Sequence, residues 1–536
     1  MSINPQVYAL FFRAQNSLSQ ARADEARQLL IRALSISSGF PPAWHLLADT
    51  YSAQGRNPEA IKTLKRALKT LAKDQAAQSA LQIHLASLLL KEDEVAEAVS
   101  TIDLPSLQRF SNWRLLSRAG YLLMLCEEHQ LALSAYKSAR AINDQDPELL
   151  FNSAVAHGAM GDLKTAEKMH DQVIAISTRH YPAYKLRSDL KKQTPDNNHI
   201  EELTRLTLDT SIPDEAKVHN FYALAKELED LREYGPSFAR LAQGAAIKRK
   251  SLNYDVNRDL ELLQAVADTY NNSLLSREIS SSKGEGIIFV LGMPRTGSTL
   301  IDRILSSTNK ITSAGEPNTF ARLLYTSSAD KLEIDLQNGS DLTELLKASA
   351  NINFASLGEE YERKLLARAH TKGTKYIIDK NPANFLYIGA IHLALPKAKI
   401  IHIARDPMDT CYAIYKALFK DGHPYSYDLA ELGNYYCGYR QLMRHWSKEI
   451  PNTFYEIQYE DLIENPKQEC LALFEYCELE WQDSCLEFYR NKASGTATAS
   501  TAQVRNPIYK SSLGKWKNYQ EQLKPLRQIL EKLDEQ

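Results

Sequence analysis

The first 180 residues repeat one pattern of small and large positions. Small residues recur 34, 38, 34 and 34 positions apart, and a larger side chain stands four positions after each of them. These small residues are Ala26, Ala60, Ala98, Ala132 and Ala166. A period of this length is typical of stacked helical pairs. The pattern therefore predicts five helical pairs between about residues 7 and 180, with an irregular third unit where Pro105 stands and the spacing lengthens to 38.

The clearest unit begins at Ala43 and ends at Ala67. It reads Ala-Trp-His-Leu-Leu-Ala-Asp-Thr-Tyr, turns at Gly55 and ends with a small–large–small set; Gly161 is expected at another turn. This unit resembles the tetratricopeptide repeat, a helix–turn–helix of 34 residues. The resemblance implies a concave surface that binds a protein or peptide, or one that forms a homodimer. The alternative is a rigid spacer without a partner.

A weaker helical signal follows the repeats. Apolar residues recur at helical spacing from Asp214 to Lys250 and predict a sixth helical pair. Turn-forming residues cluster between the repeats and this pair, at Gln193–His199. The predicted organisation is tetratricopeptide repeats at residues 1–192, a further helical pair with a linker at 193–280, and a second domain at 281–536.

The apolar pattern changes character after Gly286. The run Ile287–Leu291 is short and rich in β-branched residues, as in a buried parallel strand. It leads into the glycine-bearing segment Gly292–Thr299 and then into Leu300–Leu305, which has helical periodicity. In a strand–loop–helix unit of this kind, backbone N–H groups and the positive end of the helix dipole converge on one anion. The fold class expected is thus an all-helical solenoid followed by a P-loop-like α/β domain with a central parallel sheet.

The loop raises the alternative of a nucleotide kinase or other NTPase. The spacing from Gly292 to Gly297 is that of a Walker A loop, but the Walker lysine would fall at Ser298. Arg295 stands inside the loop instead, beside the hydroxyl groups of Thr296, Ser298 and Thr299. This set argues against ATP hydrolysis and favours an anion held by guanidinium, hydroxyl and amide groups without a metal.

The segment Pro294–Leu300 resembles the 5′-phosphosulfate loop of sulfotransferases, in particular the tyrosylprotein branch. Three further segments match in the same order, and two shorter ones follow near the C-terminus. They are Ser313–Glu316, Lys375–Pro382 and Lys399–Thr410, then Tyr459–Leu462 and Gly514–Trp516. The resemblance covers roughly residues 286 to 525. It implies transfer of a sulfuryl group from 3′-phosphoadenosine 5′-phosphosulfate to an acceptor hydroxyl.

The resemblance also implies roles for individual residues. Catalysis would fall to Glu316 as the base that accepts the acceptor's proton, with Lys380 and Arg295 as cations at the leaving phosphate. The donor would be bound by Arg295, Thr296, Gly297, Ser298 and Thr299 around the 5′-phosphosulfate, by Arg405 at the 3′-phosphate, by Tyr459 near the adenine and by Lys515 at the phosphates. Asp406 and Asp409 are expected to be structural, and His402 a buried core histidine.

The chain departs from the family pattern at two positions. Ala413 stands where the family has a serine that contacts the 3′-phosphate, and Pro317 follows Glu316 where the animal enzymes have a second glutamate. The first departure supports an alternative function, a repeat-based interaction protein whose second domain binds nucleotide without turnover. The acceptor stays open between a protein tyrosine, a carbohydrate and a small molecule.

Composition, charge and cysteine content exclude some classes of protein but do not indicate a function. The 536 residues carry a formal net charge of −2, which gives no signature of nucleic-acid binding. The six cysteines show no C-x-x-C pairing and are expected to be thiols in a reducing compartment. No run approaches 18 apolar residues, so we expect no membrane span and a cytoplasmic protein.

Overall fold

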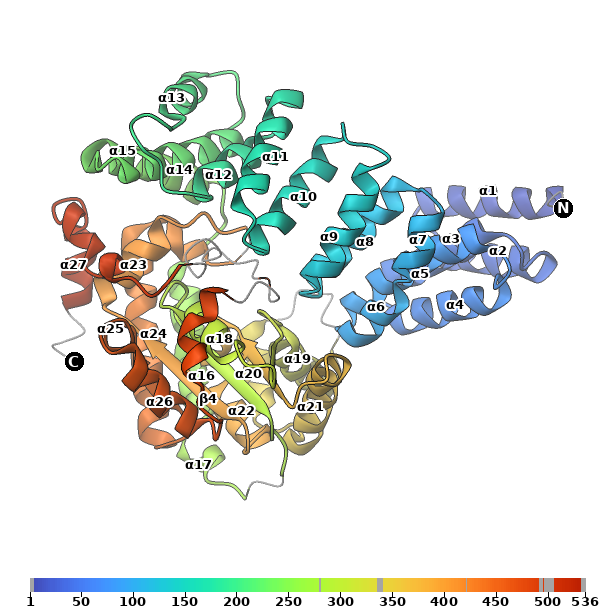
Figure 1. Cartoon of the computed structure of the whole chain (residues 1–536). Coiled ribbons are helices and arrows are strands. Elements are labelled where there is room, and N and C mark those ends of the chain that lie inside the picture. Colours follow the sequence, from blue (N-terminus) through green and yellow to red (C-terminus); the bar gives the residue numbers. More distant parts are fainter. Residues whose placement is uncertain are drawn as a thin grey trace. The chain divides into compact units, whose positions relative to one another are not determined.

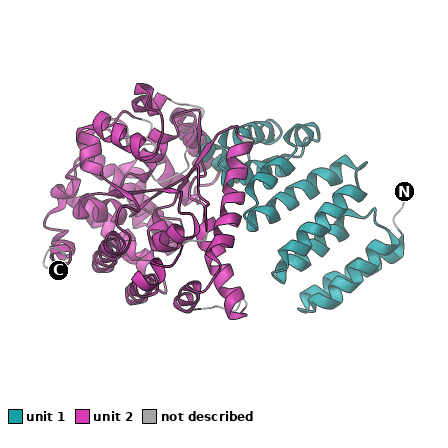
Figure 2. Ribbon diagram, turned by 90° about the horizontal axis from the view of Figure 1, so that it is seen from below, with its two compact units in different colours: residues 1–156 teal, residues 157–536 magenta. Residues whose placement is uncertain are grey.

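The structure of the chain, a computed structural model, describes residues 4–278, 281–334, 341–420, 422–490, 495 and 506–531. The chain forms two compact units, residues 1–156 and residues 157–536 (Figure 2). The division at residues 192 and 280 that the sequence suggests stays a prediction. None of the helices in the described ranges has the length and apolar character that crossing a bilayer requires.

The first unit is built from helices that follow one another along a solenoid (Figure 1). They are α1 (Pro5–Ser19), α2 (Ala23–Ile36), α3 (Pro41–Ala53), α4 (Asn57–Thr70), α5 (Gln75–Lys91), α6 (Val95–Thr101), α7 (Leu104–Arg109), α8 (Trp113–Leu125), α9 (His129–Arg140) and α10 (Pro147–Ala159), which runs across the division between the units.

The repeat pattern of the sequence is the packing pattern of this unit. Ala26, Ala60, Ala98 and Ala132 are fully buried, so the small positions lie where helices touch. The irregular third unit contains the short helices α6 and α7, and Pro105 stands in the first turn of α7. Proline is tolerated there because the first N–H groups of a helix have no intrahelical acceptor. The additional short helix α7 therefore accounts for the longer, 38-residue spacing of the third unit.

The second unit begins with further helices. They are α11 (Leu163–Ile176), α12 (Tyr181–Asp189), α13 (Ile200–Leu208), α14 (Asp214–Asp230), α15 (Tyr234–Lys250), α16 (Val256–Thr269) and α17 (Asn272–Leu275). The sixth pair predicted from the sequence is α14 with α15. It shares one hydrophobic core with the sheet that follows, because Val218, Tyr222 and Leu241 belong to the same buried cluster as Phe289.

A parallel sheet lies at the centre of the second unit. In the described part of the chain it has five strands in the order β2-β3-β1-β4-β5: β1 (Ile287–Gly292), β2 (Ile311–Ser313), β3 (Tyr376–Lys380), β4 (Lys399–Ala404) and β5 (Tyr455–Gln458). Successive residues of β1 face two different cores. Phe289 packs in one hydrophobic cluster and Val290 in the other, so both faces of the sheet are covered. The predicted central parallel sheet is confirmed.

Helices and 3₁₀ turns connect and cover the strands (Figure 1). They are α18 (Ser298–Leu305), α19 (Thr319–Leu332), α20 (Leu342–Ser349), α21 (Phe354–Thr371), η2 (Pro382–Tyr387), α22 (Ile388–Ala394), α23 (Pro407–Tyr415), η3 (Pro424–Tyr427), α24 (Leu429–Glu449), α25 (Tyr459–Glu464), α26 (Pro466–Tyr476), η4 (Asp483–Arg490), η6 (Lys510–Ser512), η7 (Lys515–Tyr519) and α27 (Lys524–Leu530).

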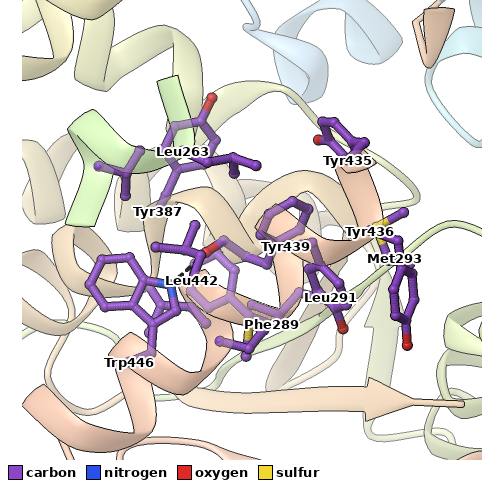
Figure 3. Packing of buried hydrophobic residues seen from close by; sticks show 14 of the residues in the cluster. Leu263, Phe289, Leu291, Met293, Tyr387, Tyr435, Tyr436, Tyr439, Leu442 and Trp446 are labelled. Carbon is purple, nitrogen blue, oxygen red and sulfur yellow. Dashed lines mark hydrogen bonds between the residues drawn. The ribbon is translucent and has the colours of Figure 1, made fainter. Parts of the chain in front are cut away.

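The long helix α24 presents an aromatic side to the sheet. Tyr436, Tyr439 and Trp446 are buried, and Figure 3 shows Tyr439 and Trp446 near Phe289 of β1. The indole N–H of Trp446 donates to the carbonyl oxygen of Phe385 at 2.9 Å, so the buried ring has a partner for its polar atom. These aromatic residues belong to the core that supports the sheet.

Close helix packing in the first unit depends on one glycine. A Cβ added at Gly120 of α8 would lie 2.7 Å from the ring of Tyr136, which is buried on α9. We expect Gly120→Ala to destabilise the fold by about 1–3 kcal/mol, the cost typical of overpacking. Gly158→Ala is the matched control, because its Cβ would be 3.7 Å from the nearest side-chain atom. Thermal unfolding followed by circular dichroism checks this, and equal midpoints for the two variants would contradict it.

Candidate functional site

The loop between β1 and α18 needs glycine at two positions. Gly292 has φ +146°, and an added Cβ would lie 2.6 Å from the carbonyl oxygen of Ile403 in β4. Gly297 has φ +114°, and its Cβ would lie 2.7 Å from the ring of Tyr459. Between them, Arg295 itself adopts a left-handed conformation with φ +66°. The loop is thus a tight turn that packs on β4 and on the first residue of α25.

The loop ends at the N-terminus of a helix. Gly297 is the N-cap of α18, which begins at Ser298. Thr296, Ser298 and Thr299 are buried, and the hydroxyl of Thr296 donates to the carbonyl oxygen of Met293 at 2.8 Å. Backbone N–H groups at a helix start, together with the helix dipole, are suited to bind an anion.

The site lies at the carboxyl edge of the sheet. Lys380 ends β3, the loop follows β1, and Arg405 directly follows β4; these three strands are neighbours in the order β3-β1-β4. The chain leaves β1 toward β2 and β3 on one side, whereas β4 pairs with its other side. A crevice where the strand order reverses in this way is the usual ligand site of an open α/β sheet.

Arg405 joins the loop to a distant segment. Its guanidinium donates to the carbonyl oxygen of Arg295 at 3.0 Å and to that of Ser512 at 2.8 Å, and it lies 4.6 Å from the centre of the Tyr459 ring. The hydroxyl groups of Tyr459 and Ser512 are 2.9 Å apart. The Nε atom of Arg405 is buried and has no acceptor among the residues that the structure describes. A donor of this kind is suited to a bound anion.

An ion pair forms at the end of β3, the strand next to β1. The buried ammonium of Lys380 makes an ion pair with Glu316, whose side chain is 48% exposed. The backbone supports this pair, because the N–H of Lys380 donates to the carbonyl oxygen of Gly315 at 3.0 Å. Asn381 adds a bond from its amide to the carbonyl oxygen of Pro317 at 3.0 Å. The structure therefore brings together two of the three residues that the sequence assigned to catalysis; the third, Arg295, is in the loop.

A cavity opens between the loop, α23 and the C-terminal segment. Its lining residues are Arg295, Gly297, Thr299, Leu300, Arg405, Ala413, Lys416, Tyr459, Ile463, Phe488, Asn506, Pro507, Ile508, Tyr509, Ser512 and Lys515. Six of the residues predicted to bind the donor line it. Thr296 and Ser298 are buried in the loop and do not line it, and Glu316 and Lys380 lie outside the lining.

The described lining of the cavity contains four cationic side chains and no carboxylate: Arg295, Arg405, Lys416 and Lys515. Burial lowers the pKa of Arg295, and the positive charge of Arg405 lowers it further. These cations repel one another, so a bound anion would relieve the repulsion.

Lys416 is the cation that the sequence analysis missed. It lies three residues after Ala413, and both residues line the cavity. Residues three apart share one side of a helix, so the predicted contact of position 413 with the ligand was a signal that could have pointed to Lys416.

Asp406 and Asp409 have structural roles, as predicted, because both carboxylates accept hydrogen bonds from backbone N–H groups. Asp406 is the N-cap of α23 and accepts from the N–H of Asp409 at 2.8 Å. The carboxylate of Asp409 accepts from the N–H of Gly514 at 2.6 Å and from that of Trp516 at 3.3 Å. It thereby fixes the segment that carries Lys515 beside α23. His402 is buried in β4, as predicted, and its Nδ1 lies 2.8 Å from the Glu456 carboxylate.

Comparisons with known proteins agree with this geometry. Residues 287–483 match the sulfotransferase family and residues 17–83 match the tetratricopeptide repeat. An uncharacterized protein of Aquifex aeolicus is 30% identical over 398 residues, which cover 70% of this chain and 49% of that protein. The chain thus spans about half the length of this relative.

Sulfotransferases from animals and bacteria are among the relatives. Protein-tyrosine sulfotransferase 1 of Danio rerio is 22% identical over 279 residues, which cover 48% of this chain and 72% of that protein. An omega-hydroxy-beta-dihydromenaquinone-9 sulfotransferase of Mycobacterium tuberculosis is 29% identical over 125 residues, which cover 21% of this chain and 31% of that protein. The strand–loop–helix site thus lies within residues 287–483, which match the sulfotransferase family, in a chain whose residues 17–83 match the tetratricopeptide repeat.

Proposed function

We propose that this chain transfers a sulfuryl group from 3′-phosphoadenosine 5′-phosphosulfate to an acceptor hydroxyl. The observation that carries the proposal is the cavity with four cations at the carboxyl edge of the sheet, next to the Lys380–Glu316 pair. The donor has anionic groups at both the 3′ and the 5′ positions of its ribose, and a site for it needs cations, hydroxyl groups and amides that contact these anions.

The residues present fit such a donor. The buried Nε of Arg405 has no acceptor among the described residues, and Gly297, the N-cap of α18, lines the same cavity. Ser298 occupies the place of the Walker lysine, which a site for Mg-ATP would use. In this proposal the loop from Arg295 to Thr299 binds the 5′-phosphosulfate, Arg405 binds the 3′-phosphate and Tyr459 packs near the adenine.

The Lys380–Glu316 pair would carry the acid–base chemistry. When bound, the donor supplies an activated sulfuryl group whose transfer leaves negative charge on the bridging oxygen. Lys380 and Arg295 would stabilise this charge, because preorganised cations act most strongly where charge develops. Glu316, which is half exposed and held at the end of β3, would accept the proton of the acceptor hydroxyl.

A protein tyrosine is the acceptor that we propose, and the repeats would bind the protein that carries it. Support comes from the resemblance of the loop and the Gly-Glu segment to the tyrosylprotein branch and from the presence of the repeats. The mycobacterial relative is named for a dihydromenaquinone acceptor, so a small-molecule acceptor is the outcome that would replace the tyrosine. The cytoplasmic location and the homodimer stay predictions.

Removal of Arg405 tests donor binding. Arg405→Ala deletes the guanidinium that lies between the loop and the Tyr459 ring, so we expect affinity for adenosine 3′,5′-bisphosphate to fall about 100-fold, the loss of roughly two charge-assisted hydrogen bonds. Isothermal titration calorimetry measures this. Arg363→Ala is the control, because Arg363 is exposed on α21 and pairs with Glu360. Tighter binding of Mg-ATP than of the bisphosphate by the unmodified chain would overturn the proposal.

Removal of the base separates catalysis from binding. We expect Glu316→Gln to lower the rate of labelled-sulfate transfer by about 10²- to 10⁴-fold, the contribution typical of a general base. Affinity for adenosine 3′,5′-bisphosphate should be retained, because Glu316 lies outside the cavity lining. Glu359→Gln on the exposed side of α21 is the matched control. Unchanged transfer by Glu316→Gln would refute the role, and a chain that binds the bisphosphate but transfers no sulfate would support the non-catalytic alternative.

Deletion of the repeats tests their role in delivery. A chain that begins at residue 160, after the end of α10, lacks the whole first unit and keeps only the last of the predicted repeat helices; it should retain affinity for the bisphosphate and transfer to a small phenol. Transfer to a tyrosine within a protein should fall at least about 10-fold in kcat/KM, because tethering of the acceptor raises its effective concentration. Steady-state kinetics with both acceptors measure the difference. Equal losses for phenol and protein would indicate damage to the catalytic domain, and no loss for the protein would refute delivery.

A further inference from the structure

A carboxylate from the helical pair α14–α15 contacts two lysines that line the cavity. Glu229 lies in the last turn of α14, outside the residues that match the sulfotransferase family. Its Oε1 atom is 2.8 Å from the Nζ of Lys416 and 3.7 Å from the Nζ of Lys515. Both lysines line the cavity, whereas Glu229 does not. The carboxylate therefore lies behind the two ammonium groups, away from the space that a ligand would occupy.

Two tyrosines fix the other oxygen of this carboxylate. The hydroxyl of Tyr412 donates to Oε2 at 2.7 Å and that of Tyr519 donates to it at 3.4 Å. Burial raises the pKa of Glu229, but the charges of Lys416 and Lys515 outweigh it and lower the pKa to about 2. The side chain is charged at neutral pH and held by partners from α23 and η7.

The lysines that Glu229 holds face the other cations of the cavity. Burial lowers the pKa of Lys416, Glu229 opposes this shift, and the charges of Lys515 and Arg295 add to the lowering. Arg295, Lys416 and Lys515 line one cavity, so their charges act on one another at short range. A lysine side chain has many rotamers. Repulsion between its ammonium group and the neighbouring cations favours the rotamers that point out of the cavity.

Lys416 is placed to replace a missing contact. Ala413 offers no hydroxyl where the family has a serine toward the 3′-phosphate, and Lys416 lies three residues later on the side of the helix that lines the cavity. We propose that Lys416 binds the same phosphate as Arg405, and that Glu229 is the positioning residue that holds Lys416 and Lys515 toward it. This inference rests on the proposed donor. It makes α14 a part of the donor site.

Two simpler roles for Glu229 predict different results. If the carboxylate only reduced the positive potential of the cavity, its neutralisation would strengthen anion binding. If it only attached α14 to the domain, its loss would affect folding and all ligands alike. Attachment of α14 does not depend on Glu229 alone, because Tyr222 and Val218 of α14 also pack in the core of the sheet. Positioning predicts a loss of affinity confined to ligands with a 3′-phosphate.

The experiment compares two ligands that differ only in that phosphate. Adenosine 3′,5′-bisphosphate and adenosine 5′-phosphate are titrated into the full chain by calorimetry, and the ratio of their affinities is the readout. We expect the unmodified chain to prefer the bisphosphate. Lys416→Ala should lower the preference about 10-fold, and Glu229→Gln, which keeps the size of the side chain but removes its charge, should lower it about 5-fold or more. Glu215→Gln, on the exposed first turn of the same helix, should leave it unchanged.

The outcomes distinguish failure of the proposed donor from failure of the positioning role of Glu229. An unmodified chain without preference for the bisphosphate would overturn the proposed donor. A preference that is equal or greater in Glu229→Gln would overturn the positioning role while leaving the donor in place. Where thermal unfolding shows that Glu229→Gln is not folded, Tyr412→Phe replaces it, because it removes the 2.7 Å hydrogen bond to the carboxylate without a change of charge. An unchanged ratio in that variant and in Lys416→Ala would overturn the inference.

Discussion

The close approach of Gly292 to β4 is the constraint on which the site depends. A Cβ at position 292 would lie 2.6 Å from the carbonyl oxygen of Ile403, and φ +146° is a conformation that favours glycine, so only glycine fits there. This contact brings the loop onto the edge of the strand that precedes Arg405. The guanidinium of Arg405 can then donate to the carbonyl oxygen of Arg295, so the loop and the strand end form one surface. A bulkier residue would separate them.

Repulsion among like charges shapes the rest of the cavity. Arg295, Arg405, Lys416 and Lys515 surround one space, and a protein can hold four cations together only if dipoles, carbonyl groups or a carboxylate offset their repulsion. The carbonyl oxygens of Arg295 and Ser512 do so for Arg405. Glu229 does so for the two lysines from behind, where it leaves the open side to a ligand. The open side, where the Nε of Arg405 has no acceptor among the described residues, is suited to receive an anion.

The helical pair α14–α15 consequently has more than a connecting role. Its apolar side belongs to the core of the sheet, and its last turn reaches the lysines of the cavity. A domain boundary drawn at the start of β1, where the sequence pattern changes and the family match begins, would divide this interaction. The two units of the structure, 1–156 and 157–536, keep it whole.

The sequence by itself determined what depends on neighbours along the chain. The small residues of the repeats, the strand–loop–helix segment and the order of Arg295, Glu316, Lys380 and Arg405 were readable, because helix packing, turn chemistry and the ends of strands leave local patterns. Caps such as Asp406 were predicted for the same reason. Only the tertiary structure decided which side chains share the cavity. Lys416 and Glu229 are 187 positions apart, and no periodicity links a residue of α14 to one of α23. Their contact follows from the packing of the helical pair on the sheet, which is a property of the shared core.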